Sequence, residues 1–209
     1  MTHIEIPIQF TDSYFQLKSM YDNIENEIRK KEGIIYYKDY RFHNYIGDIT
    51  TNINWTWAVS NESFSVFEIF LKDKIEIINK YFKNNFYIRG CSFITLYEKE
   101  VKDTDFHFDI TSHYDTPDST NAITLIFPLY IEEDMGNLEY KEGGETSVYK
   151  YYKDKMLIWD ACKLEHRTEP YSLSEKKKRV LVSMNLSTEE EWAEKNVINS
   201  LKCQGNITF

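Results

Sequence analysis

The periodicity of the apolar residues changes near residue 85, and this change restricts the possible folds more than any other feature. Before it, apolar side chains recur every three or four residues over 12–32 and again over 61–82, which predicts two amphipathic helices. Residues 53–59 alternate apolar and polar side chains and predict a strand between them. After it, short segments separated by turn residues predict a series of strands: 87–98, 106–114, 122–131, 137–142, 146–152, 155–160 and 178–186.

A closing helix is predicted from about Ser187, where Ser187 and Glu190 fit a capping box. Helices followed by a run of strands favour a strand sandwich or barrel over a parallel sheet of alternating strands and helices. The predicted fold class is therefore mainly β with flanking helices: a double-stranded β-helix, the jelly-roll core of cupins, buttressed by N-terminal α-helices. An immunoglobulin-like sandwich would leave the leading helices unexplained.

The length of 209 residues and a hydrophobic content of 42% suit one buried core. We therefore expect a single domain over 1–209, with a helical N-terminal support region at 1–85, the double-stranded β-helix at 86–187, and a C-terminal helix and tail at 188–209. Four large aromatic side chains are expected in this core rather than in a pocket wall: Trp55, Trp57, Phe127 and Trp159.

Composition argues against several classes of partner. The formal net charge of −9 does not suit a nucleic-acid binder, which usually carries a basic face. The longest apolar run, 123–131, is too short to span a bilayer, and the N-terminus lacks the pattern of a signal peptide. The three cysteines, Cys91, Cys162 and Cys203, form no C-x-x-C motif and favour a reducing compartment. We expect a cytoplasmic protein with no membrane segment.

Two H-x-D triplets and one later histidine supply the ligand types of a metal site. The triplets contain His107 and Asp109, and His113 and Asp115; the later histidine is His166. Two histidines and one carboxylate on one face of an octahedral ion are the ligand set of non-heme Fe(II) oxygenases. Six residues of strand would separate the two triplet histidines by roughly 20 Å, so they cannot bind the same ion.

Side-chain parity along the predicted strand admits either triplet. We favour His113 and Asp115, because the turn-forming residues 116–121 follow them directly and the strand must end there. His107 and Asp109 lie in the middle of the predicted strand and remain the alternative.

From Tyr97 to Leu186 the chain resembles Fe(II)- and 2-oxoglutarate-dependent dioxygenases of the prolyl-hydroxylase type. The similarity lies in six stretches in the same order: SHYDT at 112–116, ITLIFPL at 123–129, GNLEY at 136–140, MLIW at 156–159, HRTEP at 166–170 and RVLVS at 179–183. In such enzymes the metal-binding pair lies at a strand end, which suits His113 and Asp115. The spacing from Tyr97 to His107 also suits the family.

Arg179 opens an apolar strand, where a buried guanidinium requires an anion. The resemblance implies that this anion is the distal carboxylate of 2-oxoglutarate. The family's common Arg-x-Ser is absent, because Leu181 occupies the serine position. Tyr97 or Thr124 is expected to supply the missing hydroxyl contact.

The resemblance implies that Fe(II) is bound by three side chains: His113, Asp115 and His166. With 2-oxoglutarate and O2, such an enzyme hydroxylates an unactivated C–H bond of an amino acid, peptide or other small molecule and releases succinate and CO2. No catalytic residue beyond the metal ligands is predicted. Two alternatives remain: a cupin-like metal-dependent enzyme that does not use 2-oxoglutarate, and a metal-binding pseudoenzyme that acts as a binding module.

Overall fold

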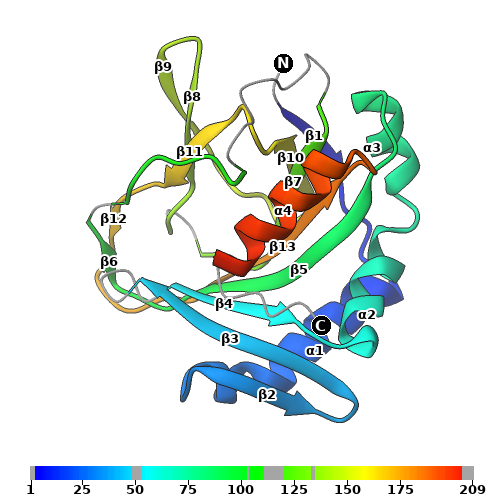
Figure 1. Cartoon of the computed structure of the whole chain (residues 1–209). Helices are drawn as coiled ribbons and strands as arrows, with labels where there is room; N and C mark the ends of the chain where they lie inside the picture. Colours follow the sequence, from blue (N-terminus) through cyan, green and yellow to red (C-terminus); the bar gives the residue numbers. More distant parts are fainter. Residues whose placement is uncertain (1–2, 49–52, 103, 111–119, 133–134, 204–209) are drawn as a thin grey trace.

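The computed structural model describes residues 3–48, 53–102, 104–110, 120–132 and 135–203. Its main element is an eight-stranded antiparallel sheet with the order β1-β10-β7-β13-β5-β4-β3-β2 (Figure 1). These strands are β1 (His3–Pro7), β2 (Gly33–Tyr37), β3 (Tyr40–Asp48), β4 (Ile53–Ala58), β5 (Tyr87–Leu96), β7 (Ala122–Tyr130), β10 (Lys155–Asp160) and β13 (Arg179–Ser187).

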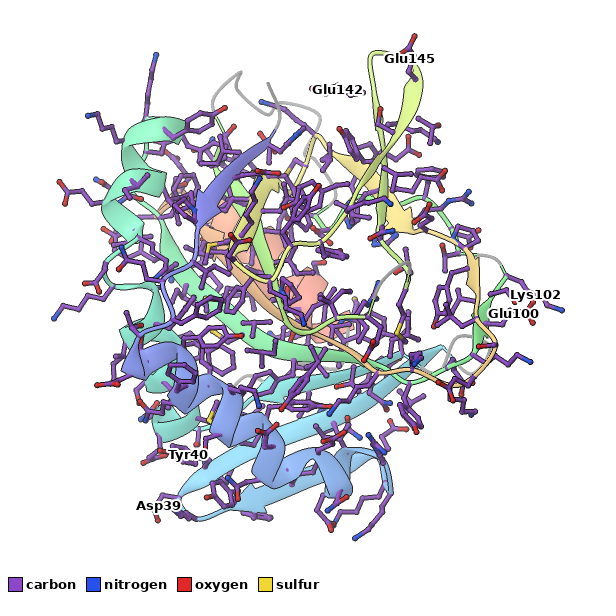
Figure 2. All side chains as sticks on the ribbon, turned by 180° about the vertical axis from the view of Figure 1, so that it is seen from behind. Asp39, Tyr40, Glu100, Lys102, Glu142 and Glu145 are labelled. Atoms are coloured by element: carbon purple, nitrogen blue, oxygen red, sulfur yellow. The ribbon has the colours of Figure 1, made fainter. Side chains whose placement is uncertain are left out.

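Two smaller antiparallel sheets lie along one side of the main sheet in Figure 1. The first has the order β11-β8-β9, and the second pairs β12 with β6. Their strands are β6 (Glu100–Val101), β8 (Leu138–Glu142), β9 (Glu145–Tyr149), β11 (Glu165–Thr168) and β12 (Tyr171–Ser172). The β8–β9 hairpin projects away from the body, with Glu142 and Glu145 at its tip (Figure 2).

The alternation of side chains along the strands gives the main sheet two different faces. On β13, Val180 and Val182 belong to the largest hydrophobic core, which also contains the buried residues of the N-terminal helices. Arg179, Leu181 and Ser183 point to the opposite face and line a cavity. Strand β13 therefore has the hydrophobic core on one face and the cavity on the other.

Four helices flank the main sheet: α1 (Asp12–Ile28), α2 (Asn61–Leu71), α3 (Ile75–Phe82) and α4 (Glu191–Cys203). The first two pack against each other and against β2, β3 and β5 on the core side (Figure 1). Helix α4 packs on β13, β5 and β7, and its Val197 and Leu201 contact a cluster that contains Trp57 from β4. It therefore covers part of the cavity side. No helix in the described ranges has the length and apolarity needed to cross a membrane.

The predicted fold class is confirmed: the structure is mainly β, with a jelly-roll core and flanking helices. The predicted amphipathic character of the first helix is also confirmed, because apolar residues that recur every three or four positions are buried: Leu17, Met20, Tyr21, Ile24 and Ile28. The division of the chain into a support region, a core and a tail stays a prediction.

The second predicted helix, 61–82, is in fact two helices. The break lies at Lys72–Lys74, where the Lys74 ammonium donates to the backbone oxygen of Phe70 and so caps the end of α2. Apolar periodicity continues across this break, which is why the sequence alone suggested one helix.

Three other features of the structure were not predicted correctly from the sequence. The β2–β3 hairpin was not predicted, because its turn at Lys38 and Asp39 has a left-handed lysine (φ 53°) and lacks the usual Asn-Gly signal (Figure 2). Within the predicted strand 106–114, residues 106–110 form a single bridge at His107 instead of a strand. Ser187 ends β13 and does not cap a helix, since α4 begins at Glu191.

Candidate metal and co-substrate site

Three side chains with metal-ligand chemistry meet beside the β11 strand. One ligand atom from each of His107, Asp109 and His166 lies within 4.8 Å of the other two. The backbones of His107 and His166 hold each other in place, because each amide donates to the other's carbonyl at 2.9 Å. This single antiparallel bridge brings the two imidazole ring centroids to 4.6 Å.

Hydrogen bonds to the backbone orient both imidazoles for metal binding. The Nδ1 atom of His107 lies 3.0 Å from the Asp105 carbonyl oxygen, and that of His166 lies 3.0 Å from the Leu164 carbonyl oxygen. A carbonyl can only accept, so Nδ1 carries the proton in each ring and Nε2 keeps its lone pair. Burial lowers the pKa of His166, which favours the neutral form that a metal requires.

Asp109 is oriented by its neighbours. The Trp159 indole N–H donates to Asp109 Oδ2 at 3.0 Å, while Oδ1 lies 3.6 Å from His166 Nε2. From helix α4, the Ser200 hydroxyl donates to the Asp109 backbone oxygen at 2.6 Å. One carboxylate oxygen is therefore fixed from outside the ligand group, and the other faces the histidine. Two oriented imidazoles and one oriented carboxylate fit a divalent first-row metal.

Arg179 supplies the second functional group of the site. It is 2% exposed, and its guanidinium donates to the Gly136 carbonyl oxygen. Its buried Nε has no hydrogen-bond partner, and no carboxylate in the part of the chain that the structure describes forms an ion pair with it. Burial lowers the pKa of Arg179, so the charge lies in an environment that disfavours it. A buried guanidinium without a carboxylate fits a site for an anionic ligand.

One cavity of about 380 Å³ joins the ligand group to Arg179. Tyr151 and Thr124 also line it. Burial raises the pKa of Tyr151 to about 12, so its hydroxyl remains protonated and can donate. Thr124 accepts a hydrogen bond from the Asn185 amide at 3.2 Å, which directs the threonine's own proton to another acceptor. Two hydroxyl donors and a guanidinium thus share one cavity.

The structure resembles solved enzymes over most of its length. A Pseudomonas putida prolyl-4-hydroxylase has a TM-score of 0.58 and 12% identity, with 90% of this chain and 93% of that chain covered. The chain has the 2OG-Fe(II) oxygenase fold. HygX from Streptomyces hygroscopicus, solved with nickel, 2-oxoglutarate and hygromycin B bound, shares this fold with a TM-score of 0.55, 10% identity and coverage of 90% and 84%.

A third structure with the oxygenase fold is the Trichoplax adhaerens prolyl hydroxylase in complex with a peptide fragment of hypoxia inducible factor. It has a TM-score of 0.55 and 13% identity, and the similarity covers 92% of this chain and 86% of that one. No protein-family model matches the sequence, and no curated protein matches it either. The predicted resemblance is thus confirmed by three-dimensional structure, at the level of the fold.

Within this oxygenase fold, the structure brings together some of the predicted site residues. His166, Arg179 and Thr124 all line the cavity. His113 and Asp115 lie outside the described residues. The pair that the structure places with His166 is the alternative pair, His107 and Asp109.

Tyr97 is not among the described residues that line the cavity. It is 37% exposed, and the Arg29 guanidinium lies over its ring at 4.3 Å. Arg29, the residue that follows helix α1, therefore contacts the side chain that was expected to contact the co-substrate. Tyr151 takes its place in the cavity. The sequence placed that tyrosine in the predicted strand 146–152, whereas in the structure it belongs to the segment between β9 and β10.

The four large aromatic residues divide between core and cavity. Trp57 and Phe127 are buried in hydrophobic clusters, as predicted. Trp159 is as deeply buried as these two but also lines the cavity. Trp55 is only partly buried and lines the cavity as well. Strand parity could have suggested this role for Trp159, because it alternates with the core residue Ile158 on β10.

Proposed function

We propose that this chain is an Fe(II)- and 2-oxoglutarate-dependent oxygenase that hydroxylates an unactivated C–H bond, releasing succinate and CO2. The observation that carries the proposal is one cavity that contains both a His-Asp-His ligand group and a buried arginine without a carboxylate partner among the described residues. The oxygenase fold supports it independently.

His107, Asp109 and His166 are proposed to bind the metal. They supply two Nε2 lone pairs and one carboxylate oxygen, each oriented by hydrogen bonds to other parts of the chain. Such a set would hold the ion through three side chains and would leave positions for other ligands, as in the two-histidine, one-carboxylate sites. HygX was solved with nickel and 2-oxoglutarate bound, which supports the proposal that this chain binds a metal ion together with 2-oxoglutarate.

Arg179 is proposed to hold the distal carboxylate of 2-oxoglutarate. Its unsatisfied Nε can donate to one carboxylate oxygen, and a bidentate contact is the preferred geometry for this ion pair. The hydroxyl groups of Tyr151 and Thr124 are proposed as the additional donors that replace the family's serine.

When bound, Fe(II) and 2-oxoglutarate supply the activation of O2 and the oxidation of the substrate. The protein would position these ligands and exclude water from them. The walls of the cavity are largely apolar, with Ile94, Ile126 and Leu181 on the main sheet. The substrate is proposed to be a small molecule or a peptide, as in HygX and the Trichoplax hydroxylase. We also propose a cytoplasmic location, since all three cysteines are free thiols.

The decisive test is anaerobic titration of the protein with Fe(II) and 2-oxoglutarate. We expect a visible charge-transfer band that requires both additions. A cupin-like enzyme that does not use 2-oxoglutarate would bind Fe(II) without developing this band. A pseudoenzyme that acts as a binding module would not convert 2-oxoglutarate to succinate with any substrate. Absence of the band at saturating Fe(II) would exclude the proposed function.

A further inference from the structure

The charges that the cavity contains once its proposed ligands are bound indicate the class of substrate. If the proposed function holds, the cavity contains a divalent metal ion and a dicarboxylate, whose charges cancel. The two charged protein groups that bind them, Asp109 and Arg179, also cancel, and a histidine that binds a metal adds no charge, because it binds as a neutral imidazole. Asp105 is the remaining charged residue among the described lining residues. Its carboxylate leaves the loaded cavity with one net negative charge.

Asp105 also stands two residues before His107 and contacts it through its backbone. The carbonyl oxygen of Asp105 accepts the Nδ1–H of His107 at 3.0 Å, which fixes the chain at this point beside the metal ligands. The Asp105 carboxylate itself has no hydrogen bond or ion pair with any residue of the described ranges and is exposed at the cavity. A ligand in the cavity can therefore reach it without displacing a protein cation.

The basic side chains around this segment are already paired with other carboxylates. Lys102 pairs with Glu100, as Figure 2 shows at the edge of the molecule. The other two basic residues lie over the ring of Phe106, the residue after Asp105: Lys141, which pairs with Glu165, and Arg167, which pairs with Glu139. The local cations are thus neutralised, whereas the Asp105 charge is not.

An aromatic wall adds a second attraction for a cation. Trp55 lines the same cavity on β4, next to the apolar side chains of Ile53 and Ile94. The face of an indole is the best aromatic surface for an ammonium or guanidinium group. The apolar neighbours suit the aliphatic part of such a molecule.

We propose that Asp105 and Trp55 form the substrate subsite and that the substrate carries a protonated amine on an aliphatic chain. This inference rests on the proposed function, because the metal and the dicarboxylate must fill the remainder of the cavity. The amine can belong to a free small molecule or to a lysine side chain of a peptide. Both sources present the same ammonium group to Asp105.

The test uses the full chain loaded with Zn(II), which is redox-inert, and with 2-oxoglutarate. Binding of hexylamine, 1-hexanol and hexanoate is measured by ligand-observed NMR, with quenching of tryptophan fluorescence as a second readout. We expect hexylamine to bind about five-fold more tightly than hexanol, which corresponds to the upper end of an exposed ion pair. Hexanoate should bind more weakly than either.

Asp105→Asn should remove the preference for hexylamine over hexanol, and Trp55→Leu should reduce it. Asp73→Asn, which makes the same charge change in the turn between α2 and α3, should keep it. The asparagine variant keeps the backbone carbonyl that orients His107, and Zn(II) and 2-oxoglutarate are held at saturating concentrations for each variant, so that the comparison reports on the charge at position 105.

Nα-acetyl-lysine methylamide and its norleucine analogue distinguish the two sources. If the lysine derivative binds more tightly than hexylamine, a peptide substrate is favoured; the reverse order favours a free amine. Equal binding of amine and alcohol to the loaded wild type, or a preference that survives in Asp105→Asn, would overturn the inference. Failure of the wild type to bind Zn(II) or 2-oxoglutarate would instead overturn the proposed function.

Discussion

Individual residues at the two ends of the cavity are held in different ways. The two histidines proposed as metal ligands are oriented through the backbone, by carbonyl oxygens and by their mutual bridge. Arg179 is held by burial and by one carbonyl oxygen, and its Nε lacks a partner. Substitutions at the two ends should therefore affect different ligands, and metal affinity can be measured separately from 2-oxoglutarate affinity.

His107→Ala and His166→Ala should each weaken metal binding by more than about 100-fold, because loss of a direct ligand exceeds the 10–100-fold effect typical of an outer contact. Metal affinity is measured by competition with a chelating dye. The matched control is His113→Ala, which tests the pair that the sequence favoured. If His113→Ala loses the metal and His107→Ala retains it, the pair identified by geometry is wrong.

Trp159→Phe should lower metal affinity by about 10–100-fold without unfolding the protein, because it removes the donor to Asp109 Oδ2 but keeps an aromatic ring in the core. Circular dichroism checks the fold, and the same dye competition measures the metal. Trp57→Phe, at a buried tryptophan that is not among the described residues lining the cavity, is the control for the loss of an indole. Unchanged metal affinity in Trp159→Phe would mean that the indole only fills space.

Arg179→Ala should raise the dissociation constant of 2-oxoglutarate by roughly 30-fold or more, since truncating one partner of a buried charge pair costs about 2–5 kcal/mol. Calorimetry with Zn(II) in place of Fe(II) gives the constant directly. Metal affinity should remain unchanged. Lys177→Ala, which removes an exposed cation paired with Glu175, should have no effect on either ligand. Equal 2-oxoglutarate binding by Arg179→Ala and wild type would favour the cupin-like alternative.

At the scale of secondary-structure elements, the turn before β8 brings the backbone against Arg179. Gly136 has a φ of +58°, and a Cβ at this position would lie 3.0 Å from Arg179 Nη1 and 3.0 Å from Thr168 Cγ2. Glycine is therefore required twice, for its left-handed conformation and for the close approach of the guanidinium. The sequence contained this glycine within the GNLEY stretch, but its contact with Arg179 needed the structure.

Gly136→Ala should destabilise the protein by about 1–3 kcal/mol and weaken 2-oxoglutarate binding, because the added methyl group displaces Arg179. Gly143→Ala is a close control: its φ is +61°, and a Cβ there would meet no atom within 4 Å. The control should show the conformational cost alone, with unchanged 2-oxoglutarate affinity. Thermal unfolding and calorimetry provide the two measurements. Equal losses in the two variants would exclude a specific effect on Arg179.

Strand β4 was predictable from its alternation, strands β7 and β10 from their continuous apolar runs, and the helix over 12–28 from its apolar face. The 104–110 segment was not, because a single bridge at His107 leaves no periodic signal. For the same reason the choice between the two H-x-D triplets could not be made from spacing. The role of Tyr151 depends on packing between distant segments, which local sequence does not encode. His166 and Arg179, which both line the cavity, could be selected as candidates from the sequence because each has a distinctive neighbouring sequence.

At the scale of the whole molecule, the proposed ligands should stabilise the fold, since they bind only the native cavity. At a concentration 100 times its dissociation constant, one ligand adds about 2.7 kcal/mol. For a domain of this size that corresponds to an increase in Tm of about 5–10 °C. Differential scanning fluorimetry with Zn(II), with and without 2-oxoglutarate, measures the increase.

The part of this stabilisation that depends on 2-oxoglutarate should disappear in Arg179→Ala, whereas the part that depends on Zn(II) should remain. Glutarate, which lacks the keto group, should give a smaller increase in Tm than 2-oxoglutarate if chelation contributes. An equal increase from 2-oxoglutarate in the absence of metal would argue that the two ligands do not share one site.

The position of β13 gives the two halves of the cavity different resistance to opening. This strand is hydrogen-bonded along its length to β5 and β7, whereas the described part of the segment that carries His107 and Asp109 pairs with β11 through one bridge. Local opening of 104–110 would then cost far less free energy than separation of the central strands. If the proposed metal site is correct, we expect a bound metal ion to exchange with solution while the sheet and Arg179 stay folded, so that the protein without its metal would still be able to bind a new ion.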